Sequence, residues 1–118
     1  MATQKAFDRY EIKIFGGNKE RVGLLMCYSG ESFVGRIDFY AEGTTIPQDY
    51  LWHPNPVGEY VVLQMPMNRF ESVVSIVRNE KPLQLYIDVN RGIGAMTKGY
   101  GYLATSEKEP IGEEEGGP

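Results

Sequence analysis

The side chains that could perform chemistry in this chain are few and scattered. His53 is the only histidine; it precedes a proline in a segment without regular periodicity, and nothing in the sequence marks a partner for it. Asp49 lies four residues earlier, but in a loop that spacing does not place two side chains on one face. Nucleophilic catalysis and zinc binding each need several such groups at defined spacing. We therefore interpret His53 as structural or incidental and expect no catalytic residue, no metal ion and no cofactor.

The glycines and the single cysteine also lack the context of a reactive or phosphate-binding site. No GxGxxG or GxxxxGK(S/T) segment occurs between a predicted strand and a predicted helix, so a nucleotide-binding loop is not indicated. Cys27 is the only cysteine and lies in an apolar run. This excludes an intrachain disulfide and favours a small buried side chain. We expect a protein that is not an enzyme.

A different pattern occurs near the C-terminus, where a lysine and two tyrosines alternate with other residues. Lys98, Tyr100 and Tyr102 would project from the same face of a strand, with Tyr86 on the neighbouring predicted strand. Aromatic rings interleaved with cations suit single-stranded nucleic acid, because rings stack on bases and cations neutralise phosphates. With three residues added from earlier predicted strands, the candidate nucleic-acid-binding residues are Lys13, Arg36, Tyr40, Tyr86, Lys98, Tyr100 and Tyr102.

The same tyrosines also suit arrangements that involve no nucleic acid, and the sequence leaves these open. Tyrosines are common on half-exposed antiparallel sheets, where cross-strand packing accounts for them without a ligand. They could also form an interface with a second subunit or a partner, together with residues 41–58. A third possibility is a small molecule bound between helix and sheet. Our leading hypothesis is a domain that binds single-stranded nucleic acid, and the alternative is a protein-interaction or dimeric structural module.

Length and charge limit the possible functions further. A chain of 118 residues is expected to form one domain with a single core. Its formal charge is −4, from 16 acidic and 12 basic residues. Residues 107–118 hold five of the acidic residues and one of the basic ones, so residues 1–106 carry 11 of each sign. Because this part is neutral overall, any positive field must come from local segregation of charge.

No segment of the chain resembles a targeting or membrane-spanning sequence. The first ten residues, MATQKAFDRY, lack the apolar core of a signal peptide. No apolar run approaches the ~20 residues that a helix needs to cross a bilayer. We expect a cytoplasmic protein with no membrane association.

One amphipathic helix is predicted in the second half of the chain. Its apolar residues follow the spacing i, i+3, i+4 and i+7 of a single helical face, and they are Phe70, Val73, Val74 and Val77. Asn68 followed by Glu71 has the form of a capping box, which predicts the start of the helix. Because Pro82 cannot continue a helix, we expect the end near residue 79 or 80.

Six strands are predicted around this helix. Their ranges are 9–15, 21–28, 33–40, 60–65, 83–89 and 93–104. Short turns between the first three predict an antiparallel meander, and residues 90–92 predict a hairpin turn between the last two. The predicted fold class is therefore α+β, with a curved antiparallel sheet of about six strands in the order β-β-β-β-α-β-β, packed on one amphipathic helix.

Alternation along the strands predicts which side chains face the core. In the strand 33–40 the inward residues are expected to be Phe33, Ile37 and Phe39. In the last strand they are expected to be Gly99, Gly101 and Leu103. Glycine at such positions allows another backbone or a large side chain to approach closely.

Three parts of the chain are expected along its length. Residues 1–8 are predicted to be a flexible leader, residues 9–105 a single α+β domain, and residues 106–118 a disordered acidic tail. Within the domain, the connection 41–58 contains three prolines and is long for a compact fold. We expect it to be either a compact excursion that Trp52 anchors to the domain or a functional segment.

Three phrases of the chain resemble a known family. RYEIKIFGGNKERVGLL, ESFVGRIDFYAEGTTIPQDYLWHP and MNRFESVVSIVRNEKPLQLYID are similar to small uncharacterised cyanobacterial proteins with the Whirly-like single-stranded-DNA-binding transcriptional regulator fold. The resemblance, over residues 9 to about 105, implies a unit of four strands and a helix, a homodimer formed through helices and sheet edges, and affinity for single strands. The chain has neither the lysine-rich KGKAAL-like segment of plant Whirly proteins nor the basic N-terminal arm of the coactivators, so no family binding residue is transferred to it.

Overall fold

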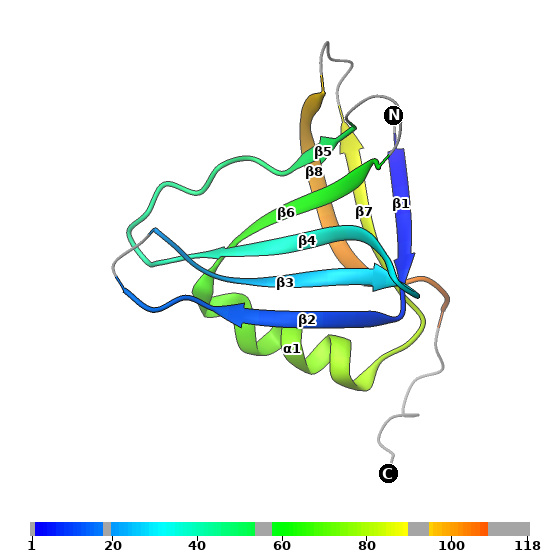
Figure 1. The fold of residues 1–118 in the computed structure, drawn as a ribbon, viewed down its shortest axis with the longest axis horizontal. Helices are drawn as coiled ribbons and strands as arrows, with labels where there is room; N and C mark the ends of the chain where they lie inside the picture. The colour runs from blue at the N-terminus through cyan, green and yellow to red at the C-terminus, as the bar shows by residue number, and fades with distance from the viewer. Residues whose placement is uncertain (1, 18–19, 54–57, 90–94, 109–118) are drawn as a thin grey trace.

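The structure, a computed structural model, describes residues 2–17, 20–53, 58–89 and 95–108. Over these residues it contains eight strands and two helical segments (Figure 1). The helical segments are the 3-10 turn η1 (Met67–Arg69) and the helix α1 (Phe70–Asn79). The strands are β1 (Ala2–Phe7), β2 (Arg9–Ile14), β3 (Arg21–Ser29), β4 (Ser32–Tyr40), β5 (Tyr50–Trp52), β6 (Tyr60–Pro66), β7 (Leu83–Val89) and β8 (Met96–Thr105).

The predicted α+β class is confirmed, but the prediction of about six antiparallel strands is wrong. All eight strands form one mixed sheet with the order β1-β7-β8-β5-β6-β4-β3-β2. Adjacent strands are antiparallel except β4 and β6, which run parallel. The parallel pair arises because the segment after β4 first forms β5, which lies beyond β6 in the sheet. The long connection 41–58 therefore contributes a central strand.

The two edges of the sheet belong to one bent segment at the N-terminus. Residues 2–7, expected to be part of a flexible leader, instead form β1 and pair along their whole length with β7. β2 forms the opposite edge beside β3, and only Asp8 separates it from β1. The Asp8 carboxylate accepts the Gly30 N–H at 2.9 Å, and the Asp8 N–H donates to the Tyr28 carbonyl at 2.9 Å. These bonds fix the bend between β1 and β2, which remain at opposite ends of the strand order.

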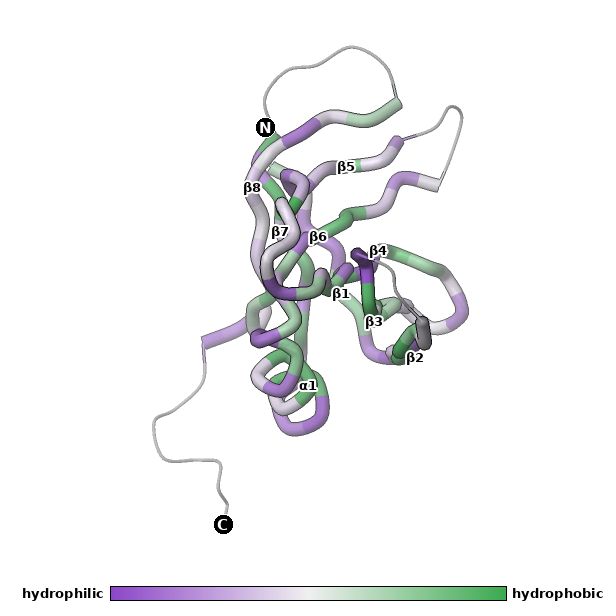
Figure 2. Tube along the Cα trace, turned by 90° about the vertical axis from the view of Figure 1, so that its left-hand side faces the viewer, coloured by the Kyte–Doolittle hydropathy of each residue, from purple (hydrophilic) through white to green (hydrophobic). Residues whose placement is uncertain are grey.

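The sheet is bent into two parts that cross at a steep angle, with the core between them (Figure 1). In Figure 1, β2, β3 and β4 run across the view, whereas β1, β7 and β8 run from top to bottom. Figure 2 shows the two parts facing each other, with α1 at their lower end. The helix contributes Val73 and Val77 to the core, and the Phe70 ring meets the Phe39 ring edge-on at 5.1 Å. Three of the four predicted stripe residues, Phe70, Val73 and Val77, thus pack in or against the core together with Ile76, whereas Val74 does not belong to this cluster.

The predicted end of the helix is confirmed, but its predicted start is wrong. α1 ends at Asn79. At its other end, η1 turns the chain directly after the extended residue Pro66, so Asn68 lies inside the 3-10 turn and the α-helix begins at Phe70. No side-chain hydrogen bond caps the helix at its N-cap residue, Arg69. The capping box is absent because the turn begins earlier than the sequence pattern indicates.

Phe33 lies on the opposite face of the sheet from the one predicted. The pairing of β3 with β4 shifts between Cys27 and Tyr28, which marks a β-bulge. A bulge adds one residue to one strand and changes the faces of its neighbours. The Phe33 ring consequently packs edge-on against Tyr28 at 5.8 Å and Tyr60 at 4.9 Å, while Val34 packs against the core.

The predicted role of the glycines in the last strand is confirmed. A Cβ atom added at Gly99 would collide with the carbonyl oxygen of Asp88. One added at Gly101 would collide with the carbonyl oxygen of Tyr86 and lie 2.6 Å from Leu63 Cδ2. Any larger residue would push β7 and β8 apart, so glycine is required for this close pairing.

The predicted hairpin turn at 90–92 lies outside the described residues. The predicted acidic tail lies largely outside them, because the structure describes only its first three residues. Within the described part of the chain, none of the helical segments combines the length and the apolar character needed to cross a bilayer.

Candidate nucleic-acid interface

Strand pairing places most aromatic side chains on the side of the sheet that faces away from the core, called here the outer face. In neighbouring strands Tyr102 lies opposite Tyr86, and Tyr50 lies opposite Lys98. Residues paired in this way share a face. Of the chain's eight tyrosines, only Tyr10 lies on the core side, opposite the buried Cys27. The outer face is therefore a tyrosine-rich surface.

The most exposed part of the outer face is formed by β7 and β8 and is called the tyrosine patch. It consists of Tyr86, Lys98, Tyr100 and Tyr102. Tyr100 is 74% exposed and Tyr102 is 50% exposed. The rings of Tyr86 and Tyr102 stack with centroids 4.5 Å apart and an interplanar angle of 15°. Lys98 is exposed, and no ion pair joins it to another described residue.

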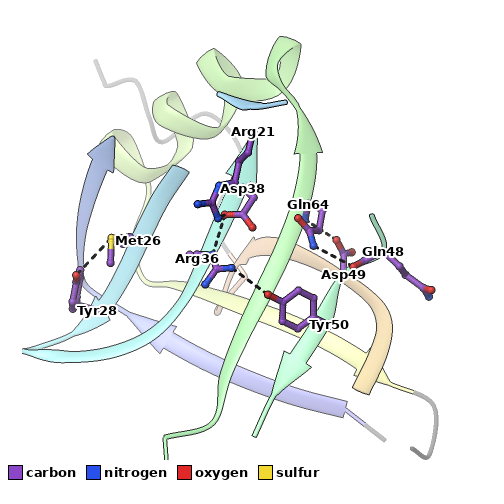
Figure 3. Close-up of polar contacts among 9 residues, drawn as sticks. All are labelled: Arg21, Met26, Tyr28, Arg36, Asp38, Gln48, Asp49, Tyr50 and Gln64. Carbon is purple, nitrogen blue, oxygen red and sulfur yellow. Dashed lines mark hydrogen bonds and ion pairs between the residues drawn. The ribbon is translucent and has the colours of Figure 1, made fainter. Parts of the chain in front are cut away.

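A second group of outer-face residues, the arginine cluster, lies on β3, β4 and β5 (Figure 3). It consists of Arg21, Arg36, Asp38 and Tyr50. Asp38 is only 2% exposed; it accepts the Arg36 Nε–H at 2.9 Å, and Arg21 Nη1 lies 3.6 Å from the same oxygen. Arg36 Nη2 also donates to the Tyr50 hydroxyl at 3.1 Å. Burial alone would lower the pKa of Arg36, but the hydrogen bond and charge of Asp38 raise it, so the ion pair is maintained.

Half-buried rings surround the arginine cluster. The Arg36 guanidinium lies 5.9 Å from the centroid of the Tyr60 ring, within cation–π range. Tyr60 in turn packs against Phe33 at 4.9 Å and Trp52 at 6.4 Å. Trp52 is thus anchored to the domain through Tyr60, as one of the two expectations for residues 41–58 proposed.

Five of the seven candidate binding residues lie close together. Lys98, Tyr100 and Tyr102 share β8, Tyr86 is next to them on β7, and Arg36 reaches Tyr50, which pairs with Lys98. The remaining two, Tyr40 and Lys13, do not join the patch. Tyr40 is half-buried at the far end of β4, where it pairs with Arg21. Lys13 lies on the edge strand β2, separated from β8 by β3, β4, β6 and β5.

A half-buried carboxylate, Asp49, links the two halves of the outer face. β5 begins at Tyr50, and next to its first residue Asp49 bridges β6 and β8: one carboxylate oxygen accepts the Gln64 N–H at 2.7 Å and the other accepts the Gly101 N–H at 3.0 Å. Figure 3 shows Asp49 beside Gln64. Burial raises the pKa of Asp49, and the two backbone donors partly offset this effect. No sequence pattern indicates this role, because both contacts join residues far apart in the chain.

His53 is partnered, although nothing in the sequence indicated its partner. Its Nε2 lies 2.8 Å from the hydroxyl oxygen of Thr97, and Thr97 is a buried residue of β8. Among the described residues no group of three or more His, Cys, Asp or Glu side chains could hold a metal ion. The contact supports the interpretation of His53 as a structural residue that attaches the end of β5 to β8.

Sequence reasoning missed the aromatic residues around Arg36. Tyr50 and Trp52 lie in a three-residue strand inside a proline-rich segment, which is too short to show alternation. Tyr28 and Phe33 flank a bulge. A usable signal existed only at Tyr60, which begins the β-favouring run of β6.

Comparison of the chain with protein-family models, with curated proteins and with solved structures finds no match. The resemblance to the Whirly-like fold therefore stays a prediction.

Proposed function

We propose that this protein is a non-enzymatic domain that binds single-stranded nucleic acid on its outer face, with the tyrosine patch as the contact. The observation that carries the proposal is the pair of exposed rings, Tyr100 and Tyr102, on the same strand as the exposed Lys98. Stacking on aromatic rings is tolerant of sequence because every base has a π face. A transcription-regulator-like role, which the resemblance to the Whirly-like fold implies, would require such binding.

The arrangement of the rings supports stacking rather than simple packing. Tyr86 and Tyr102 already stack on each other, so Tyr86 fixes the orientation of a ring that is half exposed. Tyr100 projects beyond this pair, with three-quarters of its surface in solvent. Cross-strand packing alone would cover such a ring. Two oriented platforms on one strand are what successive bases of a single strand require.

The experiment is a titration of a fluorescently labelled oligothymidine, followed by fluorescence anisotropy at low and at raised salt. The wild-type protein should bind, and the affinity should fall with salt because phosphates are neutralised by cations. Tyr100→Ala should weaken binding by ~1 to 3 kcal/mol, the usual contribution of one stacked base.

Two variants control this titration. Tyr100→Phe retains the ring and should bind as the wild type does. Met96→Ala removes an apolar side chain that is 45% exposed on the same strand and face, and it should leave the affinity unchanged. Absence of binding at low salt, or equal affinity of Tyr100→Ala and the wild type, would refute the proposal.

A protein-binding role is the second candidate, and one observation favours it. Met96 is exposed beside the tyrosine patch, and tyrosine and methionine are both enriched in the centres of protein interfaces. If the oligonucleotide does not bind, immobilised wild-type protein should capture a partner that immobilised Tyr100→Ala fails to capture. Equal capture by both would exclude the patch as the interface.

A further inference from the structure

β2 is an edge strand whose side chains are all exposed. Its six residues each lie in solvent, including three large apolar ones: Tyr10 at 36%, Ile12 at 39% and Ile14 at 57% exposure. These three pair with Cys27, Leu25 and Gly23 of β3. Their side chains therefore lie on the same side of the sheet as the core, but they are exposed. An open edge with an apolar row is a template for another strand, and proteins usually protect such an edge.

The backbone groups that β2 offers at this edge can be identified. The Phe15 N–H donates to the Val22 carbonyl at 2.8 Å. In an antiparallel ladder, residues alternate between pairs that bond to the neighbour and pairs that do not. Arg9, Glu11 and Lys13 therefore bond to β3, and the N–H and C=O groups of Tyr10, Ile12 and Ile14 point to the open edge.

We infer that this edge binds a second copy of the chain, with β2 pairing antiparallel to β2 around a two-fold axis at Ile12. In this register Ile12 lies opposite Ile12 of the other copy, and Tyr10 lies opposite Ile14. Each copy has three residues whose backbone N–H and C=O groups point to the edge. In this register each of them lies opposite such a residue of the other copy, as a hydrogen-bonded ladder requires. The apolar rows of the two copies join into one continuous row.

The charges of β2 favour this register over the two registers that are shifted by two residues. On the other face of the strand, Glu11 lies opposite Lys13 of the second copy, and Lys13 lies opposite Glu11. A shift by two residues in one direction puts Glu11 opposite Glu11, and a shift in the other direction puts Lys13 opposite Lys13. Like charges directly opposite each other destabilise a pair of strands, so β2 is complementary to itself in one register.

The contacts already made by these charges are compatible with the pairing. Glu11 accepts the Tyr28 hydroxyl at 2.8 Å, and a carboxylate can accept further hydrogen bonds. Two identical surfaces related by a two-fold axis form a closed dimer rather than a filament. The inference depends on β2 alone and not on the tyrosine patch, so it can fail or hold independently of the proposed function.

The register makes an unusual prediction for two charge-reversal variants. Glu11→Lys places lysines opposite each other at both positions, and Lys13→Glu does the same with glutamates, so each variant alone should be a monomer of 13.3 kDa. When the two variants are mixed, every position again pairs opposite charges, and a heterodimer of twice that mass should form. The measurement is analytical ultracentrifugation of the wild type, of each variant and of the mixture, after circular dichroism has shown that each variant is folded.

A cross-linking experiment tests the position of the two-fold axis. Ile12→Cys places two cysteines in a hydrogen-bonded pair about 5.5 Å apart at Cα, which is within reach of a disulfide. Ile14→Cys is the matched control: its side chain is more exposed, but the two copies lie at least about 13 Å apart along the strands. Under mild oxidation the first variant should become a covalent dimer and the second should not.

Four results would overturn the inference. They are a wild type that stays monomeric up to hundreds of micromolar, single charge reversals that stay dimeric, a mixture that forms no heterodimer, and equal cross-linking of the two cysteine variants.

Discussion

The tyrosine patch and the arginine cluster share one face of the sheet and both combine tyrosine with cationic side chains, but these side chains are exposed in the patch and partnered in the cluster. In the patch, Tyr100 is largely exposed and Lys98 has no ion-pair partner among the described residues. In the cluster, Arg36 is held by the buried Asp38 and covers the ring of Tyr60.

This difference separates binding from structural support. To contact a phosphate, Arg36 would have to give up its bond to a carboxylate that is 2% exposed, and leaving that carboxylate without its partner is costly. Lys98 has no such bond to lose to any residue that the structure describes. The patch is therefore the part of the outer face that is ready for a ligand, and the cluster joins β4 to β5, the neighbour of β8 in the sheet.

The largest effect is expected from breaking the cluster at its buried charge. Asp38→Ala removes the acceptor of Arg36 and the ion-pair partner of Arg21. Loss of one partner from a buried ion pair should lower the free energy of unfolding by about 3 kcal/mol. Urea denaturation measures this change.

The control for this variant is Glu31→Gln, which alters an exposed carboxylate in the turn after β3. Its free energy of unfolding should stay within about 0.5 kcal/mol of the wild type. If Asp38→Ala were as stable as Glu31→Gln, the arginine cluster would have no structural role.

A smaller effect is expected from the carboxylate that joins the two regions. Asp49→Asn retains one acceptor oxygen but turns an amide N–H₂ toward the second backbone donor, either Gln64 N–H or Gly101 N–H. One backbone N–H is then left without a partner, which should lower the free energy of unfolding by about 1 to 3 kcal/mol. Hydrogen exchange of the Gly101 amide measures the local opening.

The pH dependence of the wild type supplies an internal check on Asp49. Its folded-state pKa is raised above the usual value, so between the two values the folded state binds more protons than the unfolded state. The stability that Asp49 contributes is thus fully present at low pH and declines as the pH rises through the folded-state pKa. Asp49→Asn should lack this decline, and an identical pH profile for both proteins would contradict a raised pKa at Asp49.

Local patterns predicted one of these two regions and not the other. β7 has the predicted bounds, and the stacking partner of Tyr102 follows from pairing two regular strands across a hairpin. The orientation of Gly99 and Gly101 follows from the same alternation. Where a strand is regular and its neighbour is adjacent in sequence, period-two reasoning identifies the exposed side chains.

The arginine cluster depends on pairings that no local pattern contains. β5 is three residues long and lies between β6 and β8, so its position is set by strands that come later in the chain. The largely polar sequence of β1 gives no strand signal, because the apolar residues of this pair are mostly on its partner β7. Alternation predicts the face on which Lys13 lies, whereas the order of strands, which separates Lys13 from the patch, is a long-range property.

A further pair of variants tests the division between binding and support directly. Tyr102→Ala should weaken oligothymidine binding by about 1 to 2 kcal/mol, because it removes a stacking platform, and should change stability little, because the ring is half exposed. Tyr60→Ala should do the reverse, since its ring packs against Phe33, Trp52 and Arg36. Anisotropy titrations and urea denaturation of both variants make the comparison. Equal losses of affinity would place both regions in the binding surface.

The smallest expected effect concerns the two cations, Lys98 and Arg21. Lys98→Gln removes a charge that makes no ion pair with a described residue, so the slope of log affinity against log salt should fall by about one. Arg21→Gln removes a cation that lies 3.6 Å from Asp38, and because that charge already has a partner, the slope should hardly change. Anisotropy titrations at several salt concentrations measure both slopes. A larger fall for Arg21→Gln would mean that the nucleic acid crosses the arginine cluster, and the contact surface would then extend from β8 as far as β3.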